Sequence, residues 1–199
     1  YCDFSGYSDI AIGAAAILGF KIPLNFNKPF FATSPSDFWS RWHISLSSWV
    51  RDYLYFPLAL KHRRFSSIAF PSLLLSMVVM GLWHGASWNF VVWGVFHGIF
   101  LVVFTILRNK YSKPTEPFFK SKFGKLISIF VTQYLVFFTF IVFIVQDFDH
   151  MWYAMTKYVI LDFATSQTIE IINANEFASI LIILFVALHF ISYRLDVSH

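Results

Sequence analysis

The stretch "SWNFVVWGVFHGIFLVVFTIL" (residues 87–107) decides the fold class, because it runs for 21 residues without a charge. At 1.5 Å per residue, a helix of this length crosses a hydrocarbon core of roughly 30 Å. The run "LISIFVTQYLVFFTFIVFIVQ" (126–146) is equally long and uncharged, and residues 65–83 and 177–193 form two shorter apolar runs. The pattern predicts an all-α, polytopic transmembrane helix bundle.

The composition supports this prediction. Of the 199 residues, 57% are hydrophobic and 13% are charged, whereas soluble domains carry about 25% charged residues. The alternative is a soluble bundle of four fully buried helices, which the clustering of apolar residues into long runs disfavours. The single cysteine, Cys2, excludes an internal disulfide and a cysteine metal cluster.

The charges follow the membrane and do not form a nucleic-acid-binding patch, so we expect no nucleic acid partner. The connectors 61–64 and 108–125 are basic, whereas the connector 147–176 is acidic. By the positive-inside rule, the two basic connectors face the cytoplasm and the acidic one faces away. We interpret 108–125 as a solvated loop.

Two further segments precede these spans. Residues 4–20 are apolar and rich in small residues, which predicts a helix packed inside the bundle. Residues 21–35 contain prolines and asparagines and are interpreted as a turn-rich connector. The chain begins "YCDFSGYSD", without an initiator Met or a basic signal region, so we interpret residues 1–199 as part of one transmembrane domain of a longer protein.

The segment "SPSDFWSRWHISLSSWVRDYLYFPL" (34–58) predicts an amphipathic helix that lies in the interface or re-enters the membrane. Ser34, Pro35 and Asp37 supply the N-cap, a first-turn proline and a capping-box acid. Helical spacing puts two sets of side chains on different faces: Trp39, Trp42, His43, Leu46, Trp49 and Tyr53 on one, and Arg41, Ser45, Ser48 and Asp52 on the other. A plain interfacial helix without chemistry remains an open alternative.

The candidate catalytic residue is His84, in "MGLWHGASWNF" (80–90) between two uncharged runs. Ionisable groups within a membrane are costly and mark functional sites. Trp83 supplies a flat wall, and Asn89 offers an amide that could orient an imidazole or hold an oxyanion. A buried, neutral imidazole can act as a general base toward a hydroxyl.

Other chemistries fit less well. His84 and His97 could be haem ligands only if a second helix carried a matching pair, and none does. A zinc site or a serine nucleophile is disfavoured because the HExxH and G-x-S-x-G motifs are absent. His97 and His189 are interpreted as packed histidines, and three others as solvated: His62, His150 and His199. We expect no metal and no tightly bound cofactor.

Four motifs resemble those of the membrane-bound O-acyltransferases: "YCDFSGYSDIAIG" (1–13), "NFNKPF" (25–30), "FWSRWHISLSSWVRDYLYFPL" (38–58) and "GLWHGASWNFVVWGVFHG" (81–98). The nearest branch is the bacterial one that includes alginate O-acetylation proteins, with the D-alanyl transfer proteins of teichoic acids as a sister branch. Beyond residue 108 the resemblance is limited to hydropathy.

The resemblance implies that residues 1–199 are the C-terminal, catalytic part of one transmembrane domain whose N-terminal spans are missing. It also implies a catalytic site where an outer funnel and a cytoplasmic tunnel meet. His84 matches the family's catalytic histidine, and His43 matches its second motif histidine. Asn89 and Trp83 come from the motif around His84, and Arg41, Trp42 and Asp52 from the motif around His43. Asp3, Ser5 and Arg51 also match motif positions, without an assigned role.

The implied reaction is transfer of an acetyl group from a cytoplasmic thioester, such as acetyl-CoA, to a hydroxyl, for O-acetylation of an extracytoplasmic polysaccharide. The acceptor could also be an intermediary SGNH-type acetyltransferase. The expected location is the bacterial inner membrane, with lipid around the spans. D-alanyl transfer from a carrier protein to a cell-wall polymer is one alternative, and a non-enzymatic transporter or scaffold is another.

Overall fold

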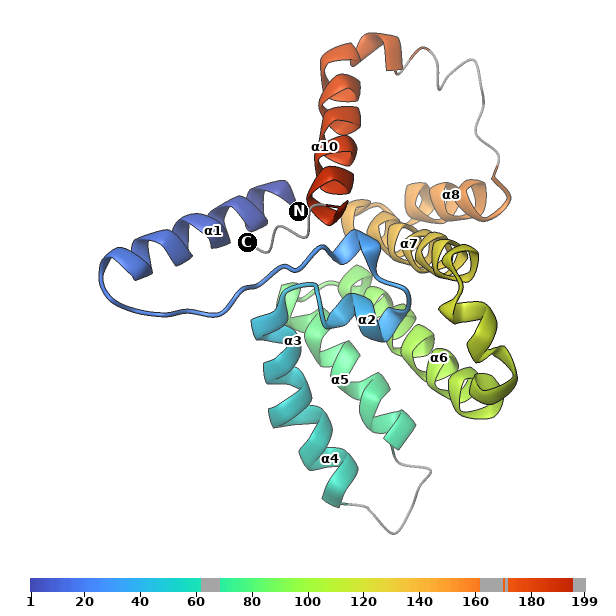
Figure 1. Ribbon diagram of the computed structural model, residues 1–199. Helices are drawn as coiled ribbons and strands as arrows, with labels where there is room; N and C mark the ends of the chain where they lie inside the picture. The colour runs from blue at the N-terminus through green and yellow to red at the C-terminus, as the bar shows by residue number, and fades with distance from the viewer. Residues whose placement is uncertain (62–68, 162–169, 171, 195–199) are drawn as a thin grey trace. The chain divides into compact units, whose positions relative to one another are not determined.

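The computed structural model describes residues 1–61, 69–161, 170 and 172–194, and within them all regular structure is helical (Figure 1). The chain divides into two compact units, Tyr1–Gln146 and Asp147–His199. The prediction of an all-α fold is therefore confirmed. Every residue proposed for the site lies in the first unit.

The helix expected over 4–20 is α1 (Cys2–Ile17). The interior packing predicted for it is not found within this chain. Ser8 is its one buried residue, while Ile10 and Ile17 are 73% and 87% exposed. The apolar sequence was correctly interpreted as helix; Phe4 packs against the rings of Phe26 and His43, whereas large side chains further along α1 are exposed.

The segment 34–58 is not one continuous helix, so that prediction is wrong. It contains α2 (Pro35–Trp39), α3 (Ile44–Val50) and the π-helical η2 (Arg51–Tyr55), which runs into α4 (Phe56–Lys61). The chain turns between α2 and α3, where His43 has φ 43° and ψ 55°. Because a left-handed residue cannot continue a right-handed helix, the predicted aromatic face ends here, and Trp49 and Tyr53 are exposed.

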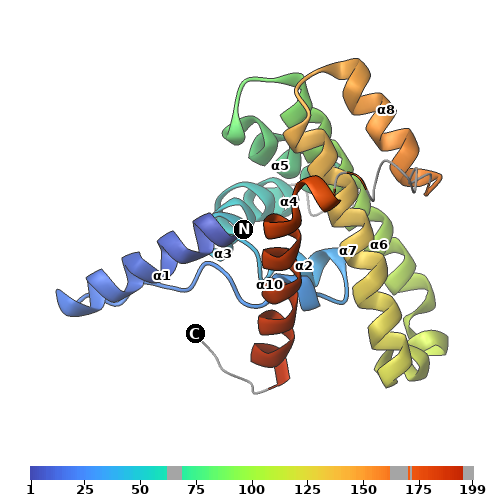
Figure 2. The ribbon, with the colours of Figure 1, turned by 90° about the horizontal axis from the view of Figure 1, so that it is seen from above.

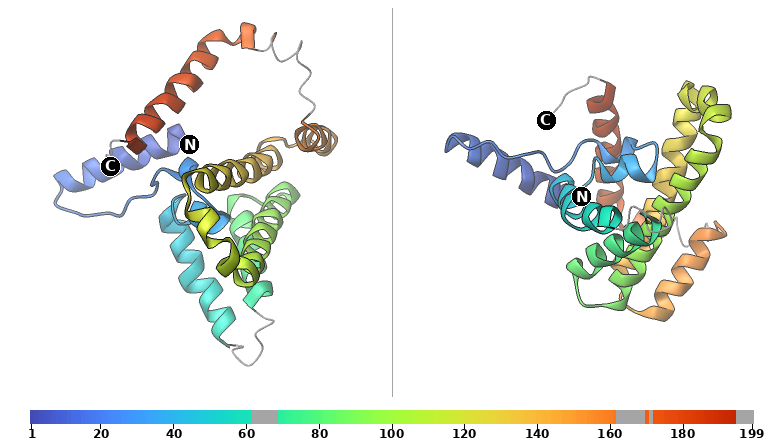
Figure 3. Two further views of the ribbon diagram at one scale, coloured as in Figure 1. Left: turned by 45° about the vertical axis from the view of Figure 1, so that its right-hand side comes forward. Right: turned by 90° about the horizontal axis from the view of Figure 1, so that it is seen from below.

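The centre of the first unit is three consecutive antiparallel helices: α5 (Ala69–His84), α6 (Trp88–Lys120) and α7 (Lys122–Ile144). α5 packs along α6, and α6 packs along α7 (Figures 1 and 2). The two further views show the same α6–α7 pairing (Figure 3). The short α2 contacts both α6 and α7.

Three glycines let α5 and α6 approach until their backbones touch. A Cβ on Gly94 of α6 would overlap the backbone carbonyl of Met77 on α5, and a Cβ on Gly81 of α5 would overlap the carbonyl of Phe90 on α6. Gly98 faces the backbone and side chain of Leu74 in the same way. Small residues at helix crossings have this effect in membrane bundles.

The solvated loop expected at 108–125 is not observed. Helix α6 continues to Lys120, and Ser121 alone separates it from α7. The hydroxyl of Ser121 accepts a hydrogen bond from the N–H of Gly124 at 3.0 Å, which caps α7. A Cβ on Gly124 would overlap the carbonyl of Phe118, so glycine is needed for the tight turn. The basic composition of this segment was interpreted as a loop, but the helix continues through it.

The second unit contains α8 (Phe148–Val159) and α10 (Glu176–Arg194). Asp147 caps α8 by accepting a hydrogen bond from the N–H of His150 at 2.9 Å. The acidic connector 147–176 is therefore helical in its first part. Its residues 162–169 and 171 lie outside the described residues. His62, His199 and most of the basic connector 61–64 also lie outside them.

In the part of the chain that the structure describes, three helices are long and apolar enough to cross a membrane: Trp88–Tyr111, Lys122–Ile144 and Glu176–Arg194. They coincide with three of the four spans predicted from sequence. The fourth, predicted at 65–83, is described from residue 69 as α5, a shorter apolar helix of 16 residues.

The α5–α6 contact predicts the effect of adding one methyl group. Gly94→Ala should lower the free energy of unfolding by about 1–3 kcal/mol, because a backbone carbonyl cannot yield as a side chain can. The measurement is the midpoint of thermal aggregation of the detergent-solubilised protein. Gly13→Ala is the control, since nothing lies within 4 Å of a Cβ there. Equal midpoints for the two variants would contradict this packing.

Candidate functional site

His84 is the last residue of α5, and its imidazole lies against aromatic rings from the two neighbouring helices. Its ring centroid is 5.2 Å from that of Trp93 and 5.1 Å from that of Phe143, both at 85°. Phe90 lies 6.2 Å away and Trp83 5.0 Å away. We call His84, Phe90, Trp93 and Phe143 the His84 cluster. It surrounds a titratable ring with uncharged, flat surfaces.

The turn after His84 brings α6 back against α5. A Cβ on Gly85 would collide with the Phe90 ring, so glycine allows that ring to pack under the turn. Ser87 is the N-cap of α6. The buried Asn89 donates its amide N–H to the carbonyl of Val145 at 2.6 Å. This bond satisfies a carbonyl at the end of α7, so the Asn89 amide fixes the helices around His84.

His43, the second predicted histidine, is the N-cap of α3 and is held in a left-handed conformation. The loop residues Asn25 and Asn27 bracket it. The N–H of Asn27 donates to the carbonyl of Arg41 at 2.9 Å, and the N–H of Ile44 donates to the carbonyl of Asn25 at 3.0 Å. A strained conformation persists where its surroundings determine it, and these bonds fix the direction of the His43 side chain.

The His43 and His84 rings are separated by Trp83. The Trp83 centroid is 5.8 Å from that of His43 and 5.0 Å from that of His84. Phe4 of α1 covers the other side of His43 at 4.7 Å. Burial lowers the pKa of His43, and the nearby His84 lowers it further. Both effects favour the neutral form of the His43 imidazole. Trp83 itself is 62% exposed.

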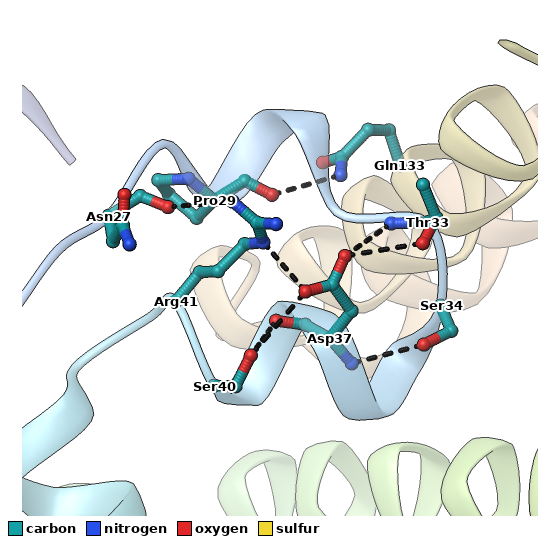
Figure 4. A network of polar contacts seen from close by, with 8 residues as sticks. All are labelled: Asn27, Pro29, Thr33, Ser34, Asp37, Ser40, Arg41 and Gln133. Atoms are coloured by element: carbon teal, nitrogen blue, oxygen red, sulfur yellow. Dashed lines mark hydrogen bonds and ion pairs between the residues drawn. The ribbon is translucent and has the colours of Figure 1, made fainter. Parts of the chain in front are cut away.

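Arg41 is used to hold the loop and α2 together (Figure 4). Its Nε lies 2.7 Å from Oδ1 of Asp37, and its Nη1 donates to the carbonyl of Asn27 at 3.4 Å. Asp37 also accepts from the N–H of Thr33 at 2.9 Å. Burial by itself would raise the pKa of Asp37, but the bonds from Thr33 and Arg41 outweigh it and hold that pKa below its ordinary value.

The predicted N-cap of α2 is confirmed in part. The hydroxyl of Ser34 accepts from the N–H of Asp37 at 3.0 Å, and Pro35 is the first helical residue. The carboxylate of Asp37 turns back to Thr33, one residue before the position that a capping box requires. Gln133 of α7 donates to the carbonyl of Pro29 at 3.2 Å and thereby ties the same loop to the span (Figure 4).

The other predicted residues lie apart from His84. Trp42 is stacked on Tyr1 and Phe38, with centroids at 5.7 and 5.5 Å, and packs against the loop. Asp52 forms an exposed ion pair with Arg51 at 2.7 Å on η2. Asp3 and Ser5 lie on α1. The structure thus brings His43, Trp83 and His84 together, with Asn89 behind them, and places Arg41, Trp42 and Asp52 in the supporting loop and helices.

Sequence reasoning missed the core behind the site. Trp93 packs against His97 with centroids 4.6 Å apart, and Trp39 of α2 packs against both. His97 is fully buried, and its Nε2 is hydrogen-bonded to Oγ1 of Thr139 on α7 at 2.9 Å. The signal for Trp93 was its position nine residues after His84, on the face of α6 that also carries His97.

Chemically, this arrangement provides two imidazoles in an aromatic, uncharged setting at the end of a span. A neutral imidazole in such a setting can accept a proton from a hydroxyl. The aromatic rings cover part of the His84 imidazole, which is half-buried. Among the described residues, no group of three or more His, Cys, Asp or Glu is placed to hold a metal ion.

Comparison with known proteins identifies the family of this chain. A family model described as MBOAT, membrane-bound O-acyltransferase family, matches residues 1–146, which include every element around His43 and His84. The chain belongs to the membrane-bound O-acyltransferase family. With its apolar helices, this makes it a membrane protein, and the resemblance of its four motifs to this family is confirmed.

The relatives act on different polymers. The chain is 49% identical over 108 residues to a probable alginate O-acetylase from Azotobacter vinelandii, covering 54% of this chain and 21% of the relative. It is 45% identical over 118 residues to a peptidoglycan O-acetyltransferase from Helicobacter pylori, covering 59% and 21%. It is 35% identical over 160 residues to a teichoic acid D-alanyltransferase from Streptococcus thermophilus, covering 72% and 38%.

The chain thus spans about a fifth of the length of the two O-acetyltransferases and less than two fifths of the D-alanyltransferase. The part matched by the family model, residues 1–146, contains both motif histidines.

The Arg41–Asp37 pair predicts a pH-dependent stability. Asp37→Asn keeps an acceptor for Thr33 but loses the ion pair, and should lower the free energy of unfolding by at most about 1 kcal/mol, because the pair is partly exposed. Since the pKa of Asp37 is depressed in the folded state, the difference from wild type is full near pH 7 and disappears as the pH falls through that pKa.

The measurement is the thermal midpoint of both proteins between pH 3 and pH 7. Glu116→Gln is the control, because its ion pair with Lys120 is exposed at the end of α6. A pH-independent difference for Asp37→Asn would show that the ion pair does not stabilise the loop.

Proposed function

We propose that this chain contains the acyl-transfer site of an O-acyltransferase, in which His84 is the general base. The observation that carries the proposal is the position of the His84 imidazole, at the end of an apolar helix and against Trp93 and Phe143. The family assignment supports the reaction class. Placing an ionisable group in apolar surroundings is costly, and such groups mark functional sites. Use of His84 as a base would account for its presence there.

The reaction follows from the chemistry of a thioester and a hydroxyl. His84 takes the proton of the acceptor hydroxyl while the hydroxyl oxygen forms a bond to the carbonyl carbon of the thioester. The tetrahedral intermediate then collapses, the carbon–sulfur bond breaks, and the imidazolium returns its proton to the leaving thiolate. Exclusion of water by the His84 cluster limits hydrolysis of the thioester.

The other site residues would position the substrates. His43 lies close to Trp83, which also contacts His84, and its imidazole can orient the acceptor hydroxyl or hold the carbonyl oxygen. Asn89 holds the end of α7 in place. Arg41, Trp42 and Asp52 act through the loop and helices that position His43.

The acyl group is proposed to be acetyl, donated by acetyl-CoA or another thioester and delivered to an extracytoplasmic polysaccharide, directly or through an SGNH-type acetyltransferase. The support is the high identity to proteins named as alginate O-acetylase and peptidoglycan O-acetyltransferase. The proposed location is the bacterial inner membrane, with the donor on the cytoplasmic side.

D-alanyl transfer to a cell-wall polymer is a second candidate. Its support is the greater extent of similarity, since the teichoic acid D-alanyltransferases match 72% and 75% of this chain against 54% for the alginate O-acetylase. The two candidates share the same site chemistry and differ in the donor and the acceptor.

His84→Ala should abolish acyl transfer, with a fall of at least about 10²-fold, because a positioned acid–base group contributes 10²–10⁴-fold. The measurement is ester-linked acetate on cell-surface and secreted polysaccharide of the native host, at matched protein levels in the membrane. Ester-linked D-alanine is measured in the same samples. His150→Ala is the control, because that histidine is exposed in α8.

If His84→Ala loses ester-linked acetate but keeps ester-linked D-alanine, the result supports acetyl transfer. If it loses D-alanine but keeps acetate, the result supports the second candidate. The decisive strain is one that depends on this protein for its surface polymer. If His84→Ala leaves both esters at normal levels in that strain, the role of His84 is refuted and a transporter or scaffold is favoured.

A further inference from the structure

Exposed basic side chains gather where α6 ends and α7 begins. They are Arg108, Lys110, Lys120, Lys122 and Lys125. The stretch 108–125, which we call the α6–α7 basic region, contains a single acidic residue, Glu116, and that residue forms an ion pair with Lys120. Most of its positive charge is therefore not balanced by acidic residues of α6 or α7.

Two contacts fix the register of α6 against α7. At one end of the pair, Asn89 donates its hydrogen bond to the carbonyl of Val145. Seven residues further along each helix, the rings of Phe96 and Phe138 lie 5.2 Å apart. Both helices rise about 1.5 Å per residue. Residues that are equally far from the Asn89–Val145 bond along the two helices therefore lie at about the same depth in the membrane.

This register places the charges of the two helices at one depth. Arg108 and Lys110 of α6 are level with residues 124–126 of α7, and therefore lie at nearly the depth of Lys122 and Lys125. The apolar runs of both helices end here. Lysine and arginine at such a boundary extend their amino and guanidinium groups toward the lipid headgroups.

The last part of α6 does not project away from the membrane. Residues 112–120 continue the helix beyond the span that ends at Tyr111, and a straight continuation would extend about 13 Å further. Instead, the carbonyl of Phe118 lies against Gly124 of α7. Figure 1 shows this yellow-green end of α6 turning back toward α7. The segment thus begins and ends at nearly the same depth, and it runs along the membrane surface.

Three exposed aromatic rings lie at this same depth. The Phe118 ring centroid is 5.2 Å from that of Phe119 and 6.4 Å from that of Phe123. Exposed phenyl rings beside ammonium groups are typical of helices in the headgroup region, where the rings reach the acyl boundary and the charges remain near the phosphates. Clusters of basic residues directly beyond a span attract anionic lipids.

We propose that the α6–α7 basic region is a docking surface for anionic phospholipids. The phenyl rings lie among the first methylene groups of the acyl chains, and the basic side chains contact the headgroup phosphates. The unbalanced positive charge selects anionic over zwitterionic lipids. This surface lies at the end of α6 remote from His84, so the proposal is independent of the acyl-transfer reaction.

The first test measures lipid selectivity with the complete protein in detergent. Dioctanoyl-phosphatidylglycerol, dioctanoyl-phosphatidylcholine and inorganic phosphate are titrated separately. The readout is the concentration that gives half of the rise in the thermal midpoint. The variant is Lys122→Gln/Lys125→Gln. Its matched control, Lys21→Gln/Lys157→Gln, removes the same charge from two positions outside the α6–α7 basic region.

Wild type should respond to the phosphatidylglycerol at a concentration at least about tenfold lower than to the phosphatidylcholine, and not to phosphate alone. The Lys122→Gln/Lys125→Gln variant should need about 10–30-fold more phosphatidylglycerol, because each cation near an anionic surface contributes roughly a fivefold gain in affinity. The control should stay within about threefold of wild type. An equal response to both lipids, an equal response to phosphate, or an equal loss in the control overturns the proposal.

The second test measures depth and does not depend on the charge variants. Phe119→Cys, in the complete protein without other cysteines, is labelled with the fluorophore NBD and reconstituted into vesicles that contain phosphatidylglycerol. We expect lipids with a doxyl group at carbon 5 of the acyl chain to quench the label more strongly than aqueous iodide does. Quenching by iodide alone shows a segment that projects into water, and quenching by neither shows one covered by protein. Either result overturns the proposal.

Discussion

The direct contact between the backbones of α5 and α6 is the constraint on which the site depends. Gly81 and Gly94 remove the Cβ atoms that would separate the two helices, and the carbonyls of Phe90 and Met77 occupy the space. This approach places the end of α5 beside the first turns of α6, and therefore His84 beside Trp93. A wider separation would leave the imidazole against lipid or water and would take the Trp93 ring out of its reach.

A second set of contacts positions the other side of the site. The loop bonds of Asn25 and Asn27 hold the turn that carries His43, and the Arg41–Asp37 pair and the bond from Gln133 tie that turn to α2 and α7. The charges in this set are paired among themselves, at a distance from the two imidazoles. The site is thus built from uncharged rings supported by polar contacts elsewhere, which suits a reaction in which charge appears only in the transition state.

Much of the fold follows from the sequence because apolar runs of sufficient length have few alternatives in a membrane. The runs around Trp93 and Thr139 and the run ending at Arg194 are helices as predicted. The failures have local causes. The helix expected through His43 is broken because His43 has a left-handed conformation, which the distant Asn25 helps to hold. Helical spacing in the sequence does not predict that conformation. The loop expected after Leu107 is helix, since prolines and charges lower the probability of helix without excluding it.

The residues proposed for the site could be selected from the sequence, but their geometry could not. His43, Trp83, His84 and Asn89 could be selected from the motifs, and the structure places them near one another. The sequence could not show that the Asn89 amide is hydrogen-bonded to Val145, or that Arg41 forms an ion pair with Asp37. Nor could it show that Trp93 packs against His84, because that depends on how closely α5 and α6 approach.

The most direct test of the account is a structure of the protein, in its complete membrane-bound form, with S-acetonyl-CoA, in which a methylene separates the sulfur from the carbonyl. The account predicts that the carbonyl carbon lies beside the His84 imidazole. An acetonyl group that binds away from the ends of α5 and α6 would contradict the central claim that this site carries out acyl transfer.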